Sequence, residues 1–135
     1  MIVSYLNSTV YNSKNSKIQC KLYYNKKAKF FKTSQYYSCQ FKKELISFDL
    51  LLKNIILLIN KNNIKPIHKI NIYTKYITNY HYKLLFDTWE YINFRGIKYS
   101  DEWRSIYLLI NEMEEILEKK YKIKKHINFN FYKGK

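Results

Sequence analysis

The sequence predicts a single domain over residues 1–135, in the α+β or α/β class, with the element order βββαβααβ. Helices are expected to pack on a five-stranded mixed sheet. Three observations predict this fold. Alternating apolar and polar residues indicate strands, apolar residues at i, i+3, i+4 spacing indicate helices, and no repeat or linker divides the chain. A chain of 135 residues with 47% hydrophobic residues can bury a real core.

Three strands are predicted at the start of the chain. Segments 2–10, 18–24 and 28–37 alternate in the manner of half-buried strands. Clusters of Asn, Ser and Lys at 12–16 and 25–27 mark the turns, because the chain has only two Gly and one Pro. Consecutive strands with short turns predict an antiparallel meander.

Helical periodicity begins after these strands. Residues 43–59 place apolar side chains at helical spacing, and extra leucines widen the stripe, so this helix is expected to be buried on most sides. Two more helices are predicted at 79–94 and 101–122, with Gly96 ending the first and Ser100 as N-cap of the second. The expected inner face of the last helix is Trp103, Ile106, Tyr107, Ile110, Met113 and Leu117.

Short alternating segments at 70–74 and 127–132 supply the fourth and fifth strands. No stretch approaches the roughly 18 apolar residues of a membrane span, and residues 1–4 lack the basic region of a signal peptide. Cys20 and Cys39 are too few for a disulfide framework or a structural zinc site, so a reduced, packed pair is expected.

Charge is the strongest functional signal in the sequence. The formal net charge is +15. Residues 1–86 contain fifteen Lys against two acids, residues 87–118 eight acids against three bases, and residues 119–135 seven Lys and no acid. This distribution predicts a polyanion on one side, while the acidic helix 101–118 faces solvent or a neighbouring protein. The alternatives are a Lys excess that only reflects AT-rich codon usage, and a membrane surface.

The lysines predict a nucleic-acid surface in two groups, one on the first hairpins and one near the end of the chain. Phosphate contacts would give salt-dependent affinity without sequence specificity. Tyrosines near the first group could stack on unpaired bases, although core packing is the favoured interpretation of each; they are Tyr23, Tyr24, Tyr36 and Tyr37. The predicted nucleic-acid-binding residues are Lys14, Lys17, Lys21, Lys26, Lys27, Lys29, Lys32, Lys119, Lys120, Lys122, Lys124, Lys125, Lys133 and Lys135.

Several short segments, taken in order, carry a family resemblance. They are Leu6-Asn7-Ser8-Thr9, Glu44-Leu45, Tyr73-Thr74-Lys75-Tyr76, Trp89, Arg95-Gly96-Ile97-Lys98, Trp103 and the closing Phe129-Asn130-Phe131-Tyr132-Lys133-Gly134. In this order they resemble the ribonuclease H family over nearly the whole chain. The resemblance implies a ribonuclease H-like five-stranded mixed sheet with helices packed on it.

The resemblance also implies where a catalytic site would be. In that family, clustered carboxylates hold two Mg²⁺ ions for phosphodiester hydrolysis. The corresponding positions here are Asn7, Glu44 and Lys75, of which only Glu44 is a carboxylate. The family's last carboxylate lies on a helix after the final strand, for which the printed sequence has no counterpart. We therefore expect a degenerate site without catalytic residues, metal or cofactor, in which Glu44 is a first-turn helix residue paired with Lys75.

Other chemistry is not indicated by the sequence. His68, His81 and His126 are scattered, so surface or loop positions are expected rather than metal binding. Two glycines exclude a Gly-rich phosphate loop, and no Ser/His/Asp or Cys/His arrangement can be assembled. No small-molecule substrate is expected.

The leading hypothesis is a non-catalytic, RNA-binding architectural component of a ribonucleoprotein assembly. A mitochondrial or plastid ribosome is the leading case, with structured RNA such as ribosomal RNA and neighbouring proteins as partners. The alternative is an inactive ribonuclease H-like interaction or DNA-binding module of a viral or plasmid replication system, with a viral or cytoplasmic location. A third hypothesis is an active, divergent nuclease.

Overall fold

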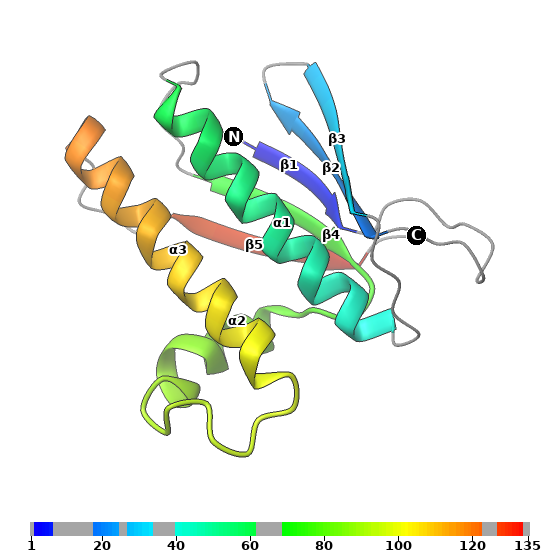
Figure 1. Ribbon diagram of the computed structural model, residues 1–135, viewed down its shortest axis with the longest axis vertical. Coiled ribbons are helices and arrows are strands. Elements are labelled where there is room, and N and C mark those ends of the chain that lie inside the picture. Colours follow the sequence, from blue (N-terminus) through cyan, green and yellow to red (C-terminus); the bar gives the residue numbers. More distant parts are fainter. Residues whose placement is uncertain are drawn as a thin grey trace.

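The computed structural model describes residues 2–6, 18–24, 27–33, 40–61, 69–122 and 127–133, with side chains placed in 41–61, 69–122 and 127–132. The elements are β1 (Ile2–Leu6), β2 (Ile18–Tyr24), β3 (Lys27–Thr33), α1 (Gln40–Asn60), β4 (Lys69–Thr74), α2 (Asn79–Leu84), the π-helical turn η1 (Leu85–Trp89), α3 (Ser100–Tyr121) and β5 (Asn128–Lys133). Figure 1 shows α1 and α3 side by side in front of the strands, with α2 at one end of the pair.

The predicted fold class is wrong for the part of the chain in which side chains are placed. We expected a ribonuclease H-like five-stranded mixed sheet, but these residues are 65% helical and contribute two strands, β4 and β5, which run parallel in one sheet. The physical reason is the length of α1 and α3, 21 and 22 residues, whose facing apolar stripes supply most of the core. For β1, β2 and β3 the structure describes the backbone alone. These three strands continue the sheet beyond β4, in the order β3-β2-β1-β4-β5.

The core forms where α1 meets α3. Both helices bury the apolar stripes that the sequence predicts, because residues at i, i+3 and i+4 share one face of a helix. Tyr107, also expected on the inner face, is instead half-buried at the margin, where its ring contacts Phe86 and Phe94. The fully buried residues of the two stripes include Leu45, Leu51, Leu52, Ile55, Ile59, Ile106, Ile110 and Met113.

Polar contacts fix α1 and α3 in a parallel arrangement. The hydroxyl of Ser105 donates to the carboxylate of Asp49 at 2.5 Å, which also pairs with Lys53 at 2.8 Å. Near the far end of both helices, the ammonium of Lys120 donates to the carbonyl of Ile59. Because Asp49 precedes Ile59 along α1 just as Ser105 precedes Lys120 along α3, the two helices run in the same direction.

One face of β4 and β5 packs against the helices. The ring of Phe48 on α1 lies 6.2 Å from that of Phe129 and 5.6 Å from that of Phe131, centroid to centroid. Tyr82 on α2 contacts the same two rings. At the outer edge of β5, the amide side chain of Asn79 both donates to the carbonyl and accepts from the N–H of Phe131. The Asn79 side chain therefore satisfies backbone groups of β5 that an edge strand would otherwise leave without a hydrogen-bond partner.

The second predicted helix is shorter than expected. The sequence predicts a helix over 79–94, whereas α2 ends at Leu84, η1 at Trp89, and turns follow as far as Tyr99. The cause is the burial of Phe94, which holds the backbone in the left-handed region at φ 59°. The guanidinium of Arg104 lies 5.5 Å from the centre of this ring and donates to the carbonyl before it.

Two residues predicted to mark helix ends, Gly96 and Ser100, have other positions in the structure. Gly96 has φ +69°, as expected of a turn glycine, but it lies within the turns and not at a helix end. Ser100 is the first helical residue and not the N-cap; the N-cap is Tyr99, in the left-handed region and without a capping side chain. Within the described segments, no helix combines the length and apolar character that crossing a bilayer requires.

Two leucines on α1 test the packing directly. Leu52→Ala should lower the free energy of unfolding by about 2–5 kcal/mol, because it removes methylenes from a fully buried position and leaves a cavity. The matched control is Leu57→Ala on the same helix, where the side chain is 53% exposed and the change should stay within about 0.5 kcal/mol. Equal effects in urea denaturation would contradict the orientation of α1.

Candidate nucleic-acid interface

Glu44 is the one carboxylate among the predicted site positions, and it accepts hydrogen bonds mainly from backbone N–H groups. It lies in the second turn of α1, not in the first as expected, and is 2% exposed. One carboxylate oxygen accepts from the hydroxyl of Thr74 at 2.5 Å and from the N–H groups of Tyr76 and Ile77 at 2.8 and 3.2 Å. The other oxygen accepts from the N–H of Lys75 at 2.6 Å. The carboxylate therefore binds the start of α1 to the segment that leaves β4.

This arrangement decides what Glu44 can do chemically. An ionised carboxylate has about four lone-pair sites, two on each oxygen. Three donors converge on one oxygen of Glu44 and one donor on the other. Successive N–H groups that converge in this way form a concave anion-binding site, and their positive ends would repel a cation. Glu44 thus acts here as an internal anion held by residues 74–77, which is a structural role.

The other two positions of the expected degenerate site are Asn7 and Lys75, and no contact between either side chain and Glu44 is described. Lys75 approaches through its backbone N–H, while its side chain is exposed and forms no ion pair with Glu44. The predicted Glu44–Lys75 side-chain pair is therefore wrong, because the loop turns the ammonium outwards. Asn7 lies outside the described residues. Among the residues with placed side chains, no group of three His, Cys, Asp or Glu side chains could hold a metal ion.

The segment that binds Glu44 continues into α2 through a reciprocal cap. The hydroxyl of Thr78 accepts from the N–H of His81 at 3.3 Å, and Nδ1 of His81 accepts from the N–H of Thr78 at 3.0 Å. The ring of His81 also stacks on Trp103 and meets Phe41 edge-on, at centroid distances of 5.7 and 5.4 Å. Burial lowers the pKa of His81 from its usual 6.5. His81 was expected on the surface or in a loop, whereas His68 and His126 lie outside the described residues.

The predicted nucleic-acid lysines are partly placed. Lys119 pairs with Glu115 at 3.0 Å and Lys120 is bound to the carbonyl of Ile59. Lys122, the third lysine of this group with a placed side chain, is exposed after the end of α3. For the remaining described lysines only the backbone is placed: Lys21 lies on β2, Lys27, Lys29 and Lys32 lie on β3, and Lys133 lies on β5. The backbone of Tyr23 and Tyr24 is also placed, on β2. Outside the described residues lie Lys14, Lys17, Lys26, Lys124, Lys125, Lys135, Tyr36 and Tyr37.

Acidic and basic residues separate by type of element. All ten acids of the chain lie between Glu44 and Glu118, in α1, η1, the turn after η1 and α3. The five strands together contain six Lys and no acid. Any polyanion therefore meets less repulsion at the strands than at the helices.

A second face of β4 and β5, not predicted from the sequence, carries amides and tyrosines. Asn71 pairs in register with Asn130 and Tyr73 with Tyr132. The two tyrosine rings stack at 5.5 Å, and Tyr132 is 43% exposed. No described helix packs on this face, because the helices contact the Phe129 and Phe131 side. The shared Asn-x-Tyr spacing of the two strands is the signal that could have revealed it.

Glu44→Gln tests the structural role of the carboxylate. We expect a loss of about 2–3 kcal/mol in the free energy of unfolding, because the amide cannot accept from all four donors and loses the charge that strengthens these bonds. Glu115→Gln, which breaks an exposed ion pair, should change stability by less than about 1 kcal/mol. A Glu44→Gln protein more stable than the wild type would instead indicate a carboxylate poised for a metal.

His81 predicts a pH dependence of stability. Because its pKa is lowered in the folded chain, protonation favours the unfolded state. The stabilisation is complete above pH 6.5 and should be lost as the pH falls through the lower folded-state pKa. His81→Gln keeps a side chain that can complete the cap but does not titrate. The stability difference between wild type and variant, measured in urea at pH 7.5 and pH 5, should therefore shrink at the lower pH; a constant difference would contradict this role.

Comparisons with known proteins do not assign the chain to a family. No protein-family model matches it. No curated protein and no solved structure matches it either. The resemblance to ribonuclease H thus has no support from a relative, and the site must be interpreted from its own geometry.

Proposed function

We propose that this chain is a non-catalytic RNA-binding protein that acts as an architectural component of a ribonucleoprotein assembly. The separation of charge carries the proposal. With a net charge of +15, the chain confines its ten acids to residues 44–118 and has six Lys and no acid in its strands. Such a charge distribution orients a phosphate backbone towards the strands and away from α3.

The state of Glu44 supports the non-catalytic part of the proposal. Hydrolysis assisted by two metal ions requires carboxylate oxygens that are open to the cations. The oxygens of Glu44 already accept four hydrogen bonds in a site that excludes solvent almost completely. A binding function needs no such open oxygens.

An assembly with several partners fits the two sides of the molecule. The acids on α3, from Asp101 to Glu118, would face solvent or a basic neighbouring protein while the strands face RNA. A mitochondrial or plastid ribosome remains the leading case for this proposal. Native purification that recovers ribosomal RNA and ribosomal proteins with the chain would support it.

Salt dependence of binding tests the proposal. By register, the positions of Lys21, Lys32 and Lys69 share the face of the sheet that carries Tyr73 and Tyr132. If each of these three lysines contacts one phosphate, log Kd should rise with log salt concentration with a slope of about 2–3, measured by fluorescence anisotropy with a structured RNA. Lys21→Gln/Lys32→Gln should lower this slope by about 1.5. Lys53→Gln/Lys98→Gln removes the same charge from α1 and from the turn before α3, and should leave the slope nearly unchanged.

Two outcomes would contradict this function. Tighter binding to duplex DNA than to structured RNA would favour a replication module. Cleavage of an RNA–DNA hybrid by the pure protein with Mg²⁺ or Mn²⁺, lost in Glu44→Gln, would show that the chain is a nuclease.

A further inference from the structure

The Tyr73–Tyr132 pair has the geometry of a stacking site with one side unused. The rings are 5.5 Å apart and inclined by 29°, so one face of Tyr132 is packed on Tyr73. Because β5 is the last strand of the sheet in the described part of the chain, no described strand lies beyond Tyr132. Among the described residues its ring contacts no other aromatic ring, and the side chain is 43% exposed. A flat aromatic group could continue this stack outwards.

Polar groups beside the tyrosines fit the edge of a base. Asn130 donates to the side-chain oxygen of Asn71 at 3.5 Å, so the two amides lie next to each other, two residues before the tyrosines on each strand. An amide offers both a donor and an acceptor, as the edges of nucleobases require. Regular strands hold these four side chains in one orientation before any ligand binds.

The backbone register extends this row of positions across four strands. Tyr5 on β1 is the partner of Tyr73, and Lys21 on β2 is the partner of Tyr5. The row Lys21–Tyr5–Tyr73–Tyr132 spans about 14 Å at the usual spacing of strands. Sheets of comparable width stack two or three unpaired bases of RNA on their aromatic residues.

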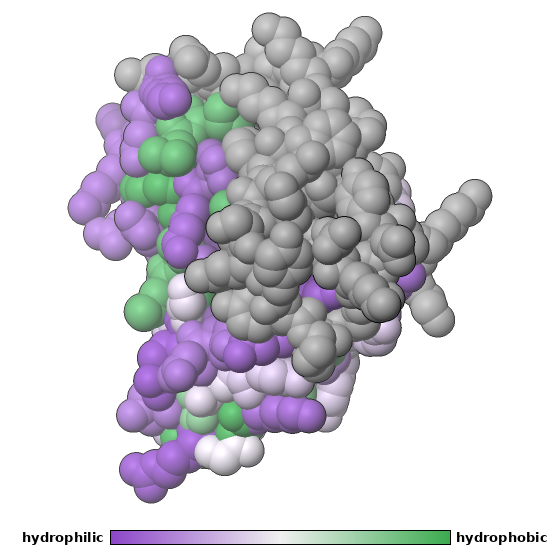
Figure 2. All heavy atoms as spheres, turned by 45° about the vertical axis from the view of Figure 1, so that its right-hand side comes forward, coloured by the Kyte–Doolittle hydropathy of each residue, from purple (hydrophilic) through white to green (hydrophobic). Residues whose placement is uncertain are grey.

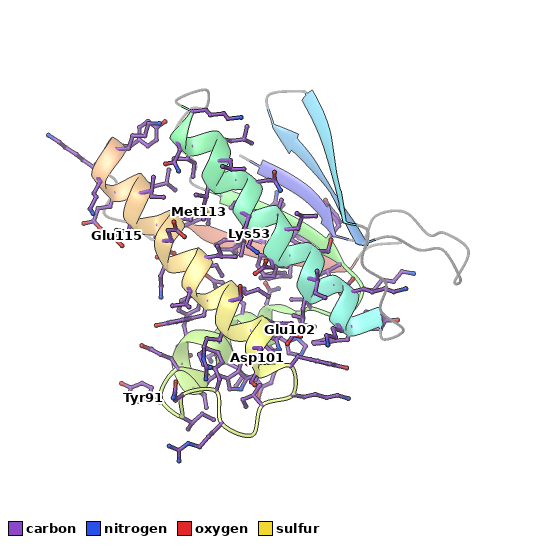
Figure 3. All side chains as sticks on the ribbon, viewed as in Figure 1. Lys53, Tyr91, Asp101, Glu102, Met113 and Glu115 are labelled. Atoms are coloured by element: carbon purple, nitrogen blue, oxygen red, sulfur yellow. The ribbon has the colours of Figure 1, made fainter. Side chains whose placement is uncertain are left out.

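Charge selects a nucleic acid as the occupant of this face. The exposed Lys69 begins β4 beside Asn128, and the strands contain no acid that would repel phosphate. The other aromatic cluster, around Phe41 and Trp103, is less suitable because its rings pack on one another beside the acids that begin α3. Figure 3 shows the acids Asp101 and Glu102 at that end of the molecule.

We propose that the open face of β4 and β5 binds single-stranded RNA by stacking unpaired bases on the Tyr73–Tyr132 pair, with Asn71 and Asn130 at the base edges and Lys69 at a phosphate. This inference rests on the proposed RNA-binding function and deepens it. It identifies unpaired segments, rather than the duplex backbone alone, as what the protein recognises.

The test compares tyrosines on and off this face. Tyr132→Leu should weaken binding of a fluorescein-labelled 12-nucleotide single-stranded RNA by roughly 5- to 100-fold, since stacking on an aromatic side chain is lost. Tyr132→Phe keeps the ring and should stay within about two-fold of the wild type. Tyr91→Leu is the matched control: this tyrosine is 86% exposed on the turn after η1, at the edge of the molecule in Figure 3, and its loss should also have an effect below about two-fold.

Stacking and charge should respond differently to salt. Tyr132→Leu should leave the salt slope unchanged, whereas Lys69→Gln should reduce it by about 0.7, the value for one phosphate contact on a single strand. Photocrosslinking with 4-thiouridine RNA followed by mass spectrometry should identify peptides that contain Tyr73 or Tyr132. Unchanged thermal melting of each variant keeps a folding defect apart from a binding defect.

The outcomes separate this inference from the proposed function. If the wild type binds no RNA, both fail. If it binds RNA but Tyr132→Leu is no weaker than Tyr91→Leu, or the crosslinks lie on α3, only the stacking face is wrong. A dimer in sedimentation experiments that Tyr132→Leu dissociates would assign the face to a second copy of the chain, and would also overturn the inference.

Discussion

The buried carboxylate of Glu44 is the constraint on which the arrangement of α1, β4 and α2 depends. A carboxylate that is almost completely removed from water costs several kcal/mol unless it is fully hydrogen-bonded. Here the segment 74–77 must turn its N–H groups back towards α1, and this turn sets where α2 begins. The first residue of α2, Asn79, then binds the backbone of β5 at Phe131. The position of the edge strand, and with it Tyr132, thus follows from an interaction on the opposite side of the sheet.

The two sides of the molecule differ in kind. On the helical side, acids on α3 alternate with apolar residues that fill the core, and Figure 2 shows a mainly hydrophilic described surface with separate hydrophobic patches. On the strand side, basic and aromatic residues occur without acids. Such a division would allow one molecule to contact a polyanion and a protein at the same time, because α3 has more acids than bases while the strands have Lys and no acid.

Local periodicity predicted the helices and strands well, but it predicted poorly how they pack together and which distant residues they contact. The stripes from Leu45 to Ile59 and from Trp103 to Leu117 are buried as expected except at Leu57 and Tyr107, and the fourth and fifth strands are within one residue of their predicted bounds. The fold class failed, since the predicted family fold was inferred from short matches while the packing is dominated by two long helices. The role of Glu44 failed for a related reason: its partners lie about thirty residues away, a distance over which spacing alone carries no information.

A rigid strand surface has a thermodynamic advantage for binding flexible RNA. Single-stranded RNA loses conformational freedom when it binds, and any side chain that must also be ordered adds to this cost. The tyrosines of β4 and β5 already stack on each other, and their amide neighbours already form a hydrogen bond, so the protein side of the interface is ordered before contact. Lysines then supply attraction that weakens with salt, while stacking supplies attraction that salt affects little. At physiological ionic strength the stacking part would therefore decide which segments of an RNA stay bound.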